Sequence, residues 1–320
     1  MSFSAEVKEE LAGKYSTARH CQIAEMSAII GMCGRIVSQG DKGTGLCIQT
    51  ENAAVSKKCF TLLQKTFNIN TDIVITKNPY LKRGDVYTIL VDNQEQARHI
   101  LQAVKLTASE GNILNTLHLA SHMVIQNNCC KRAFIRGAFL ASGSISDPEK
   151  FYHFEIVCQT QEKAAQLQEV MQAFQIDAKI VLRKKSHVVY VKEGAQIVEL
   201  LGLMEANVAL MSLENIRILK EMRNSVNRKV NCETANIHKT VNAAVKQIED
   251  IRLIEEKVGL DKLNSGLSEI ARLRLEFPEA TLKELGMMLA PQVGKSGVNH
   301  RLRKLSNLAQ DLRGNKEEFI

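Results

Sequence analysis

Small and apolar residues recur at helical spacing in two stretches of the chain, Met26–Ile36 and Ile135–Ile145. The glycines near their ends, Gly34 and Gly143, lie 109 residues apart. Later segments match at offsets of 107 to 110 residues: Cys47–Thr50 with Val157–Thr160, Phe67–Ile69 with Phe174–Ile176, and Ile73–Ile75 with Ile180–Leu182. Near-constant offsets over so many segments indicate that one structural unit is duplicated.

Helical and strand periods alternate in the same order in both units, with glycine-containing turns between strands. The first unit has predicted helices at 21–33, 52–68 and 93–106 and strands at 35–39, 45–50, 71–77 and 86–91, with turns at 40–45 and around Pro79 and Gly84. The second has helices at 129–142, 161–174 and 193–203 and strands at 144–146, 152–160, 178–183 and 187–191. Each unit is therefore αββαββα, and 111–128 is predicted to be a helical connector.

The first helix of each unit carries small residues, which allow two backbones to approach closely. The residues are Ala28, Gly31, Gly34, Gly137, Ala138, Ala141 and Gly143. Because both the pattern and its flanking segments are duplicated, we predict that these two helices pack on each other about a pseudo-twofold axis.

The last third of the chain has only helical periods. Helices are predicted at 214–224, 234–258 and 266–276, then at 281–289 with a Thr281/Glu284 capping box, and at 297–312 with Ser296 as its cap. A short helix, a turn at 291–295 and a second helix with a basic face is the helix-turn-helix layout; a generic αα-hairpin is the alternative. Seven apolar residues would set the helix crossing: Leu282, Leu285, Leu289, Val293, Val298, Leu302 and Leu305.

These elements predict an α+β fold, a duplicated αββαββα domain followed by an all-α domain. The predicted order is an N-terminal helix at 1–20, the duplicated domain at 21–212 with repeats 21–106 and 129–204, an Asn-rich basic linker at 213–233, and a helical domain at 234–313. The helix-turn-helix would occupy about 281–312.

Charge is concentrated in the last third. The 320 residues carry a net charge of +7. Residues 215–313 hold 18 Lys and Arg against 12 Asp and Glu, whereas the rest holds 24 against 23. A basic segment on a near-neutral body favours a polyanionic partner, most simply nucleic acid, and a solubilising surface is the alternative.

Several features bear on location. No apolar run reaches about 18 residues, so we expect no membrane span. The start of the chain is acidic and amphipathic, which is unlike a secretory signal. The eight cysteines form no Cys-x-x-Cys pair, which favours reduced, mostly buried thiols in a cytosol. We therefore expect a cytoplasmic protein, and the nucleic-acid partner favoured by the basic segment would place it at the nucleoid.

Two motifs suggest chemistry and are set aside. His118 and His122 precede Cys129 and Cys130, but adjacent side chains on a helix point about 100° apart, so we expect at most one of these cysteines to serve a zinc site. Gly294–Ser296 resembles the end of a phosphate-binding loop, but Leu289 replaces the motif's first glycine. We predict no metal site, no cofactor and no enzymatic activity.

The duplicated body resembles the LAGLIDADG homing endonuclease fold, in which αββαββα units pair through signature helices that end in catalytic acids. Aligned on the terminal glycines, the acid positions are Cys33 and Ser142 in this sequence. Two-metal DNA hydrolysis needs carboxylates to hold hard cations. The resemblance therefore implies a retained scaffold and a lost nuclease; an active endonuclease and an RNA-splicing maturase are the alternatives.

With its C-terminal module, the whole chain resembles the WhiA family of bacterial transcriptional regulators. The most specific segments are Phe134–Ile156, Arg223–Val241 and Leu282–Leu305. The resemblance implies sequence-specific binding of double-stranded promoter DNA, linked to cell division and, in some lineages, to sporulation. The LAGLIDADG-like domain would then present a surface for another transcription or division protein.

Under this interpretation residues 296–304 enter the major groove, where Asn299 pairs with adenine and Arg301 or Arg303 with guanine. The predicted groove set is Lys295, Ser296, Asn299, His300, Arg301, Arg303 and Lys304. The residues predicted to contact phosphate or a neighbouring groove are Asn227, Arg228, Lys229 and Asn231.

Overall fold

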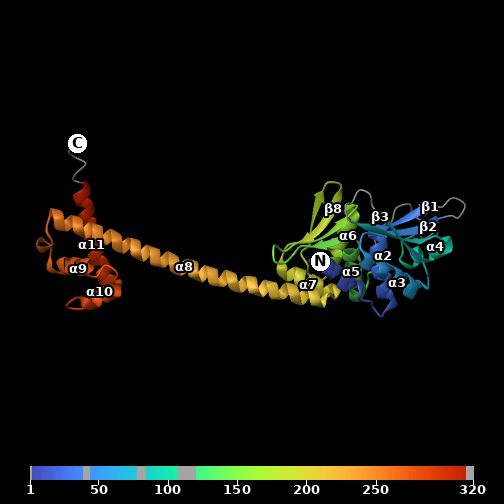
Figure 1. The fold of residues 1–320 in the computed structure, drawn as a ribbon, viewed down its shortest axis with the longest axis horizontal. Helices are drawn as coiled ribbons and strands as arrows, with labels where there is room; N and C mark the ends of the chain where they lie inside the picture. The colour runs from blue at the N-terminus through green and yellow to red at the C-terminus, as the bar shows by residue number, and fades with distance from the viewer. Residues whose placement is uncertain (1, 39–43, 78–83, 107–119, 315–320) are drawn as a thin grey trace. The chain divides into compact units, whose positions relative to one another are not determined.

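The computed structural model describes residues 2–38, 44–77, 84–106 and 120–314 (Figure 1). The chain divides into two compact units, Met1–Lys220 and Glu221–Ile320, called unit 1 and unit 2 below. Among the described residues, no helix is both long and apolar enough to cross a membrane.

Unit 1 begins with α1 (Phe3–Ala12), which is shorter than the predicted N-terminal helix. The first repeat follows as α2 (Arg19–Cys33), β1 (Gly34–Ser38), β2 (Thr44–Thr50), α3 (Ala53–Phe67), β3 (Asp72–Lys77), β4 (Asp85–Val91) and α4 (Gln94–Ala103). The side chains of Asn52 and Asn93 cap α3 and α4 by accepting a backbone N–H from the first turn. The predicted αββαββα order is confirmed. Residues 40–43 of the predicted glycine-rich turn and Pro79 lie outside the described residues, and β2 already begins at Thr44.

The second repeat has the same order: α5 (Asn128–Ser142), β5 (Gly143–Ile145), β6 (Phe154–Cys158), α6 (Gln161–Gln172), β7 (Lys179–Arg183), β8 (Ser186–Val191) and α7 (Gly194–Met204). The predicted helical connector is wrong over 120–127, which contains turns and bends but no helix. The remainder of the predicted connector, up to residue 119, lies outside the described residues.

Sheet topology confirms the duplication. Both sheets are antiparallel and four-stranded, in the orders β1-β2-β4-β3 and β5-β6-β8-β7. Even a backbone detail repeats: Asn68 and Gln175, at matching places after α3 and α6, both have left-handed φ angles of 57° and 63°. In Figure 1 the labelled strands lie on one side of unit 1, and α3 and α7 lie on the other.

Helices α2 and α5 pack against each other, as their small residues predict. A Cβ on Gly137 would overlap the backbone carbonyl oxygen of Glu25 and would lie 3.0 Å from the Ala28 Cβ. This approach requires glycine. At the other end of the helices, Gly34 and Gly143 have φ angles of −85° and −84°, so they turn directly into extended strands instead of forming left-handed caps.

A buried ionic network crosses this interface. Glu25 is fully buried, and Lys58 Nζ lies 2.6 Å from its Oε1. Lys58 also donates to the carbonyl oxygens of Leu11 and Lys14, at 2.7 and 2.6 Å. Arg136 donates to both oxygens of the Glu25 carboxylate. Because each buried charge has partners, the network can exist in an apolar core without an isolated ion.

Unit 2 contains the larger part of α8 (Asn207–Lys257), then η2 (Leu260–Lys262), α9 (Ser265–Glu276), α10 (Leu282–Met288) and α11 (Lys295–Gly314). The predicted linker at 213–233 is wrong as a break, because α8 is one helix of 51 residues through that segment. Ser296 is also not a cap, since α11 begins one residue before it.

Candidate nucleic-acid interface

The helix-turn-helix is built from α10, a turn at 289–294 and α11. Its first helix opens with the predicted capping box: Glu284 N donates to Thr281 Oγ1 at 3.3 Å, and Thr281 N donates to Glu284 Oε2 at 2.7 Å. The backbone hydrogen bond from Thr281, followed by its side-chain bond, holds the pKa of Glu284 below its ordinary value. The box therefore keeps an anionic acceptor at the helix start, where the helix dipole favours negative charge.

The turn is drawn tightly onto α10. Val293 N donates to the carbonyl oxygen of Gly286 at 3.0 Å, and a Cβ on Gly286 would overlap the Val293 carbonyl oxygen. The apolar residues predicted to set the helix crossing all belong to one core: Leu285, Leu289, Val298, Leu302 and Leu305 are buried, and Leu282 and Val293 pack against them. These contacts determine which face of α11 remains outside.

Most of the predicted groove residues lie on that outer face. Lys295, Ser296, Asn299, His300, Arg303 and Lys304 are all exposed. Their spacing of three, four and five residues places them along one side of the helix. The face combines three cations with an asparagine and a histidine, and no acidic residue falls between Lys295 and Lys304.

Arg301 behaves differently from its neighbours. Its side chain is half-buried, and Nη1 donates to the carbonyl oxygen of Gly266 in α9 at 3.4 Å. A guanidinium that closes the contact between α9 and α11 is directed into unit 2. The pattern of charge in the sequence could not distinguish this arginine from Arg303.

The second predicted set lies on α8. Asn227, Arg228, Lys229 and Asn231 are exposed, as is every residue from 221 to 243. Farther along the same helix, residues 239–248 form one wall of a groove of about 930 Å³. Its opposite wall includes Lys295 and Asn299, so the start of α11 opens onto α8 within unit 2.

Cys33 and Ser142, which are predicted to align with the acid positions of the LAGLIDADG motif, carry no carboxylate. Cys33 Sγ donates to the carbonyl oxygen of Ile29 at 3.2 Å, and Ser142 Oγ donates to that of Ala138 at 3.5 Å, so both side chains fold back on their own helices. Burial raises the pKa of Cys33 to about 12. Beside it, Lys163 Nζ donates to the carbonyl oxygen of Gly31 at 2.5 Å. The Lys163 side chain thus provides a hydrogen-bond donor for a carbonyl group in the last turn of α2.

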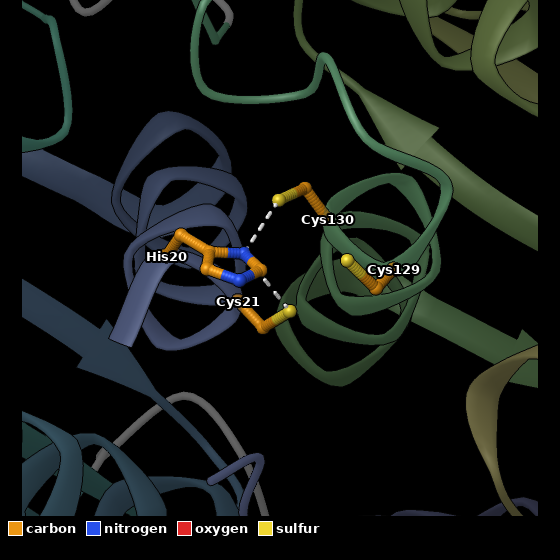
Figure 2. A group of neighbouring side chains, drawn as sticks. All are labelled: His20, Cys21, Cys129 and Cys130. Carbon is orange, nitrogen blue, oxygen red and sulfur yellow. Dashed lines mark hydrogen bonds between the residues drawn. The ribbon is translucent and has the colours of Figure 1, made fainter. Parts of the chain in front are cut away.

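A cluster of one histidine and three cysteines contradicts the expectation that only one of the adjacent residues Cys129 and Cys130 could face a common centre. His20, Cys21, Cys129 and Cys130 bring their ligand atoms within 4.8 Å of one another, so both adjacent cysteines join one group (Figure 2). Burial, followed by the neighbouring Cys129, raises the pKa of Cys21 to about 12. His122 is exposed and does not belong to this group, and His118 lies outside the described residues. The repeat offset could have predicted this cluster. His20 and Cys129, like Cys21 and Cys130, are 109 residues apart, so each pair occupies equivalent positions in the two repeats.

Known protein families account for most of the chain. Residues 19–107 match the model of the WhiA N-terminal LAGLIDADG-like domain, 131–223 the WhiA LAGLIDADG-like domain, and 226–309 the WhiA C-terminal helix-turn-helix domain. These matches confirm the predicted family resemblance.

Relatives match over nearly their full length. The chain is 55% identical to a probable cell division protein WhiA of Lachnoclostridium phytofermentans, covering 98% of this chain and 100% of the relative. A protein of the same name from Alkaliphilus oremlandii is 49% identical, with 99% of each chain covered. The crystal structure of full-length WhiA from Thermatoga maritima aligns with 97% of this chain and 99% of its own, at a TM-score of 0.57 and 24% identity, which supports the fold.

Proposed function

This chain belongs to the WhiA family, and on that premise we propose that it is a sequence-specific, double-stranded DNA-binding transcriptional regulator. Its relatives are named probable cell division proteins, and we propose that it regulates the same process, with sporulation among its targets. It would act in the cytoplasm, at the nucleoid.

The exposed face of α11 carries this proposal. A major groove about 12 Å wide admits an α-helix, and an asparagine that reaches a base edge pairs with adenine while an arginine pairs with guanine. Asn299 and Arg303 have the exposure that base contact requires. Lys295, His300 and Lys304 surround them and would contact phosphate, which fixes the register of the helix on the duplex.

The exposed residues of α8 would add a second set of phosphate contacts. Asn227 and Asn231 lie one helical turn apart, and Arg228 and Lys229 supply the positive charge between them. No acidic residue falls between Arg223 and Asn231, which suits a segment that approaches a polyanion.

Loss of nuclease activity is part of the proposal. A divalent metal at the ends of α2 and α5 needs carboxylate ligands, and Cys33 and Ser142 supply none. The Lys163 ammonium beside Cys33 disfavours a further cation there. The LAGLIDADG-like unit would serve instead as a scaffold for interaction.

One observation supports a protein partner on that scaffold. One edge strand of each sheet, β3 in the first and β7 in the second, exposes matching apolar side chains. Val74 and Ile75 are 50% and 59% exposed, and their repeat equivalents Val181 and Leu182 are 40% and 64% exposed. Exposed apolar residues repeated on two edge strands suit a partner that contacts both. We propose another transcription or division protein as that partner.

The test starts from promoter fragments recovered with the full-length protein by chromatin immunoprecipitation. Binding of purified protein to one such duplex is measured by fluorescence anisotropy. Asn299→Ala and Arg303→Ala should weaken binding to the selected site by about 1–3 kcal/mol each, with less effect on an unrelated duplex. Lys57→Ala, which removes an exposed charge from α3 in unit 1, is the matched control and should bind normally.

Three results would contradict the proposal. Linear plasmid formed by stoichiometric protein with Mg²⁺ would establish the active endonuclease. Preference for structured RNA in direct competition with the promoter duplex would establish the maturase. Binding that is unchanged in both α11 variants would move the DNA surface away from the helix-turn-helix.

A further inference from the structure

The cysteine cluster joins the two central helices of unit 1 at their beginnings. His20 and Cys21 lie in the first turn of α2, and Cys129 and Cys130 lie in the first turn of α5. His20 Nδ1 lies 3.1 Å from Cys130 Sγ and 3.4 Å from Cys21 Sγ. Figure 2 shows all four side chains converging on the space between the two helices.

Duplication explains why four candidate ligands meet. The offset that relates the repeats pairs His20 with Cys129 and Cys21 with Cys130. Equivalent positions on two helices that pack about a pseudo-twofold axis come together near that axis. The angle of about 100° between adjacent side chains does not exclude either cysteine, because a centre between the two directions is within reach of both.

The ligand set is that of a tetrahedral zinc centre. Three thiolates and one imidazole bind Zn²⁺ at about 2.3 Å and about 2.0–2.1 Å, which places neighbouring ligand atoms about 3.5–3.8 Å apart. The four ligand atoms lie within 4.8 Å of one another. Side-chain rotations that move these atoms by about 1 Å would bring them to the separations of a zinc site. Thiolates favour zinc over magnesium or calcium, which prefer oxygen ligands.

The surroundings also suit a metal centre. Cys21 and Cys130 are buried in a small apolar cluster with Ala24, Val124 and Ala133, separate from the main core. His20 and Cys129 are exposed, which leaves a path for the ion.

We propose that His20, Cys21, Cys129 and Cys130 bind one structural zinc ion, which clamps the N-terminal ends of α2 and α5 together. The site would stabilise unit 1 and would do no catalysis, since four protein ligands leave no open coordination position. It does not depend on the DNA-binding proposal, because every ligand lies in unit 1 and far along the chain from α11.

The experiment measures metal in the full-length protein. The chain is expressed with zinc in the medium, purified under reducing conditions without chelator, and analysed by inductively coupled plasma mass spectrometry. About one zinc per chain is expected. Cys129→Ser and His20→Ala change exposed residues, so both variants should fold. The zinc content of each variant should be lower than that of the wild type by about fivefold or more.

Cys232→Ser is the matched control, since Cys232 is also exposed but lies in unit 2. It should keep the full zinc content. Addition of a strong zinc chelator should lower the melting temperature of the wild type and of Cys232→Ser by several degrees. The same chelator should leave the melting temperature of Cys129→Ser unchanged. Co²⁺ added to metal-free protein should give the visible absorption of tetrahedral thiolate coordination, lost in Cys129→Ser.

Three outcomes would overturn the proposal. Zinc below about 0.1 per chain, together with no Co²⁺ spectrum, would show that the cluster does not bind metal. Equal zinc in wild type and Cys129→Ser would place the metal elsewhere. Detection of a Cys21–Cys129 or Cys21–Cys130 disulfide in freshly purified protein, by mass spectrometry after thiol alkylation, would identify the cluster as a redox pair.

Discussion

Arg136 of α5 forms a bidentate pair with Glu25 of α2: Nε and Nη2 donate to the two carboxylate oxygens at 3.0 and 3.1 Å. Both side chains are almost completely buried. Nη1 also lies 3.0 Å from Glu205 Oε2, and Nη2 donates to Ser16 Oγ at 2.8 Å. One guanidinium therefore joins three parts of unit 1 that are distant in the sequence: α5, the segment 16–25 and Glu205.

Arg136→Met should destabilise unit 1 strongly. The substitution keeps the apolar stem but removes the donors, so the buried Glu25 carboxylate retains only Lys58 as an ionic partner. Breaking a buried ionic network in this way costs about 3–5 kcal/mol of unfolding free energy, measured by urea denaturation. Lys179→Met is the control, because its pair with Asp177 is mostly exposed, and such pairs contribute about 1 kcal/mol or less. Equal losses would show that burial of Arg136 does not matter.

Alanine substitutions of Asn299 and Arg301 should have different effects, one on DNA binding and the other on stability. Asn299 is exposed, so its loss should weaken specific DNA binding by about 1–3 kcal/mol and leave the melting temperature unchanged. Arg301 donates to Gly266 inside unit 2, so its loss should lower stability, by about 1 kcal/mol, with little change in base preference. Anisotropy on matched and single-base-changed duplexes, with parallel thermal melts, decides between them. If only Arg301→Ala changed the base preference, Arg301 would be among the residues that contact bases.

The salt dependence of DNA binding should reside in the last third of the chain. Each phosphate contact contributes about −0.9 to the slope of log affinity against log salt concentration. Fragment 215–313, with 18 basic and 12 acidic residues, should keep most of the slope and much of the affinity of the full chain. Fragment 1–212 should bind weakly and with little sequence preference. A steep slope in 1–212 alone would make the LAGLIDADG-like sheets the main DNA surface.

Glu155 should make unit 1 sensitive to acid. Burial alone would raise the pKa of its carboxyl group, but the hydrogen bond from His153, the charge of Arg183 and the hydrogen bond from Ser144 together hold the pKa below the ordinary value. A carboxylate with a lowered pKa stabilises the folded state above its unfolded pKa of about 4.3, and this contribution is lost as the pH falls through the lower, folded value.

The comparison for Glu155 is with Glu155→Gln, in denaturant titrations from pH 6 to pH 3. The wild type should lose more stability than the variant below about pH 4.3. Parallel pH profiles would show that the contacts around Glu155 contribute nothing. Glu149→Gln, an exposed change in the preceding turn, controls for the loss of one charge.

Much of the fold was predictable because the duplication supplied two readings of each element. A strand such as β5, only three residues long, is weak on its own, but it lies at the same offset as β1. The error in α8 has a physical origin: Asn224, Ser225, Asn227 and Asn231 have low helix propensity and indicated a break. Met222, Val226 and Val230 continue at four-residue spacing through the same segment, and the helix follows that period.

The candidate sites were predicted less evenly. Exposure of Asn299, Arg303 and Lys304 follows from the helical period of α11, since the apolar residues face the core. The diversion of Arg301 to Gly266 depends on how α9 packs, which the linear pattern does not contain. The cysteine cluster required the pairing of α2 with α5 to be applied to the first turn of each helix. From the sequence, only His118 and His122 were considered as partners of Cys129 and Cys130, and His20 and Cys21 were not.

The contact between Lys163 and the end of α2 has a consequence for any attempt to build a metal site at Cys33. An aspartate restored at Cys33 would meet an ammonium already bonded to Gly31, and the two would form an internal ion pair instead of a metal ligand. Lys163 would have to be replaced as well before the new acid could hold a cation. A single substitution at Cys33 is therefore not expected to create a cation site, because the local charge of Lys163 has to change in the same step.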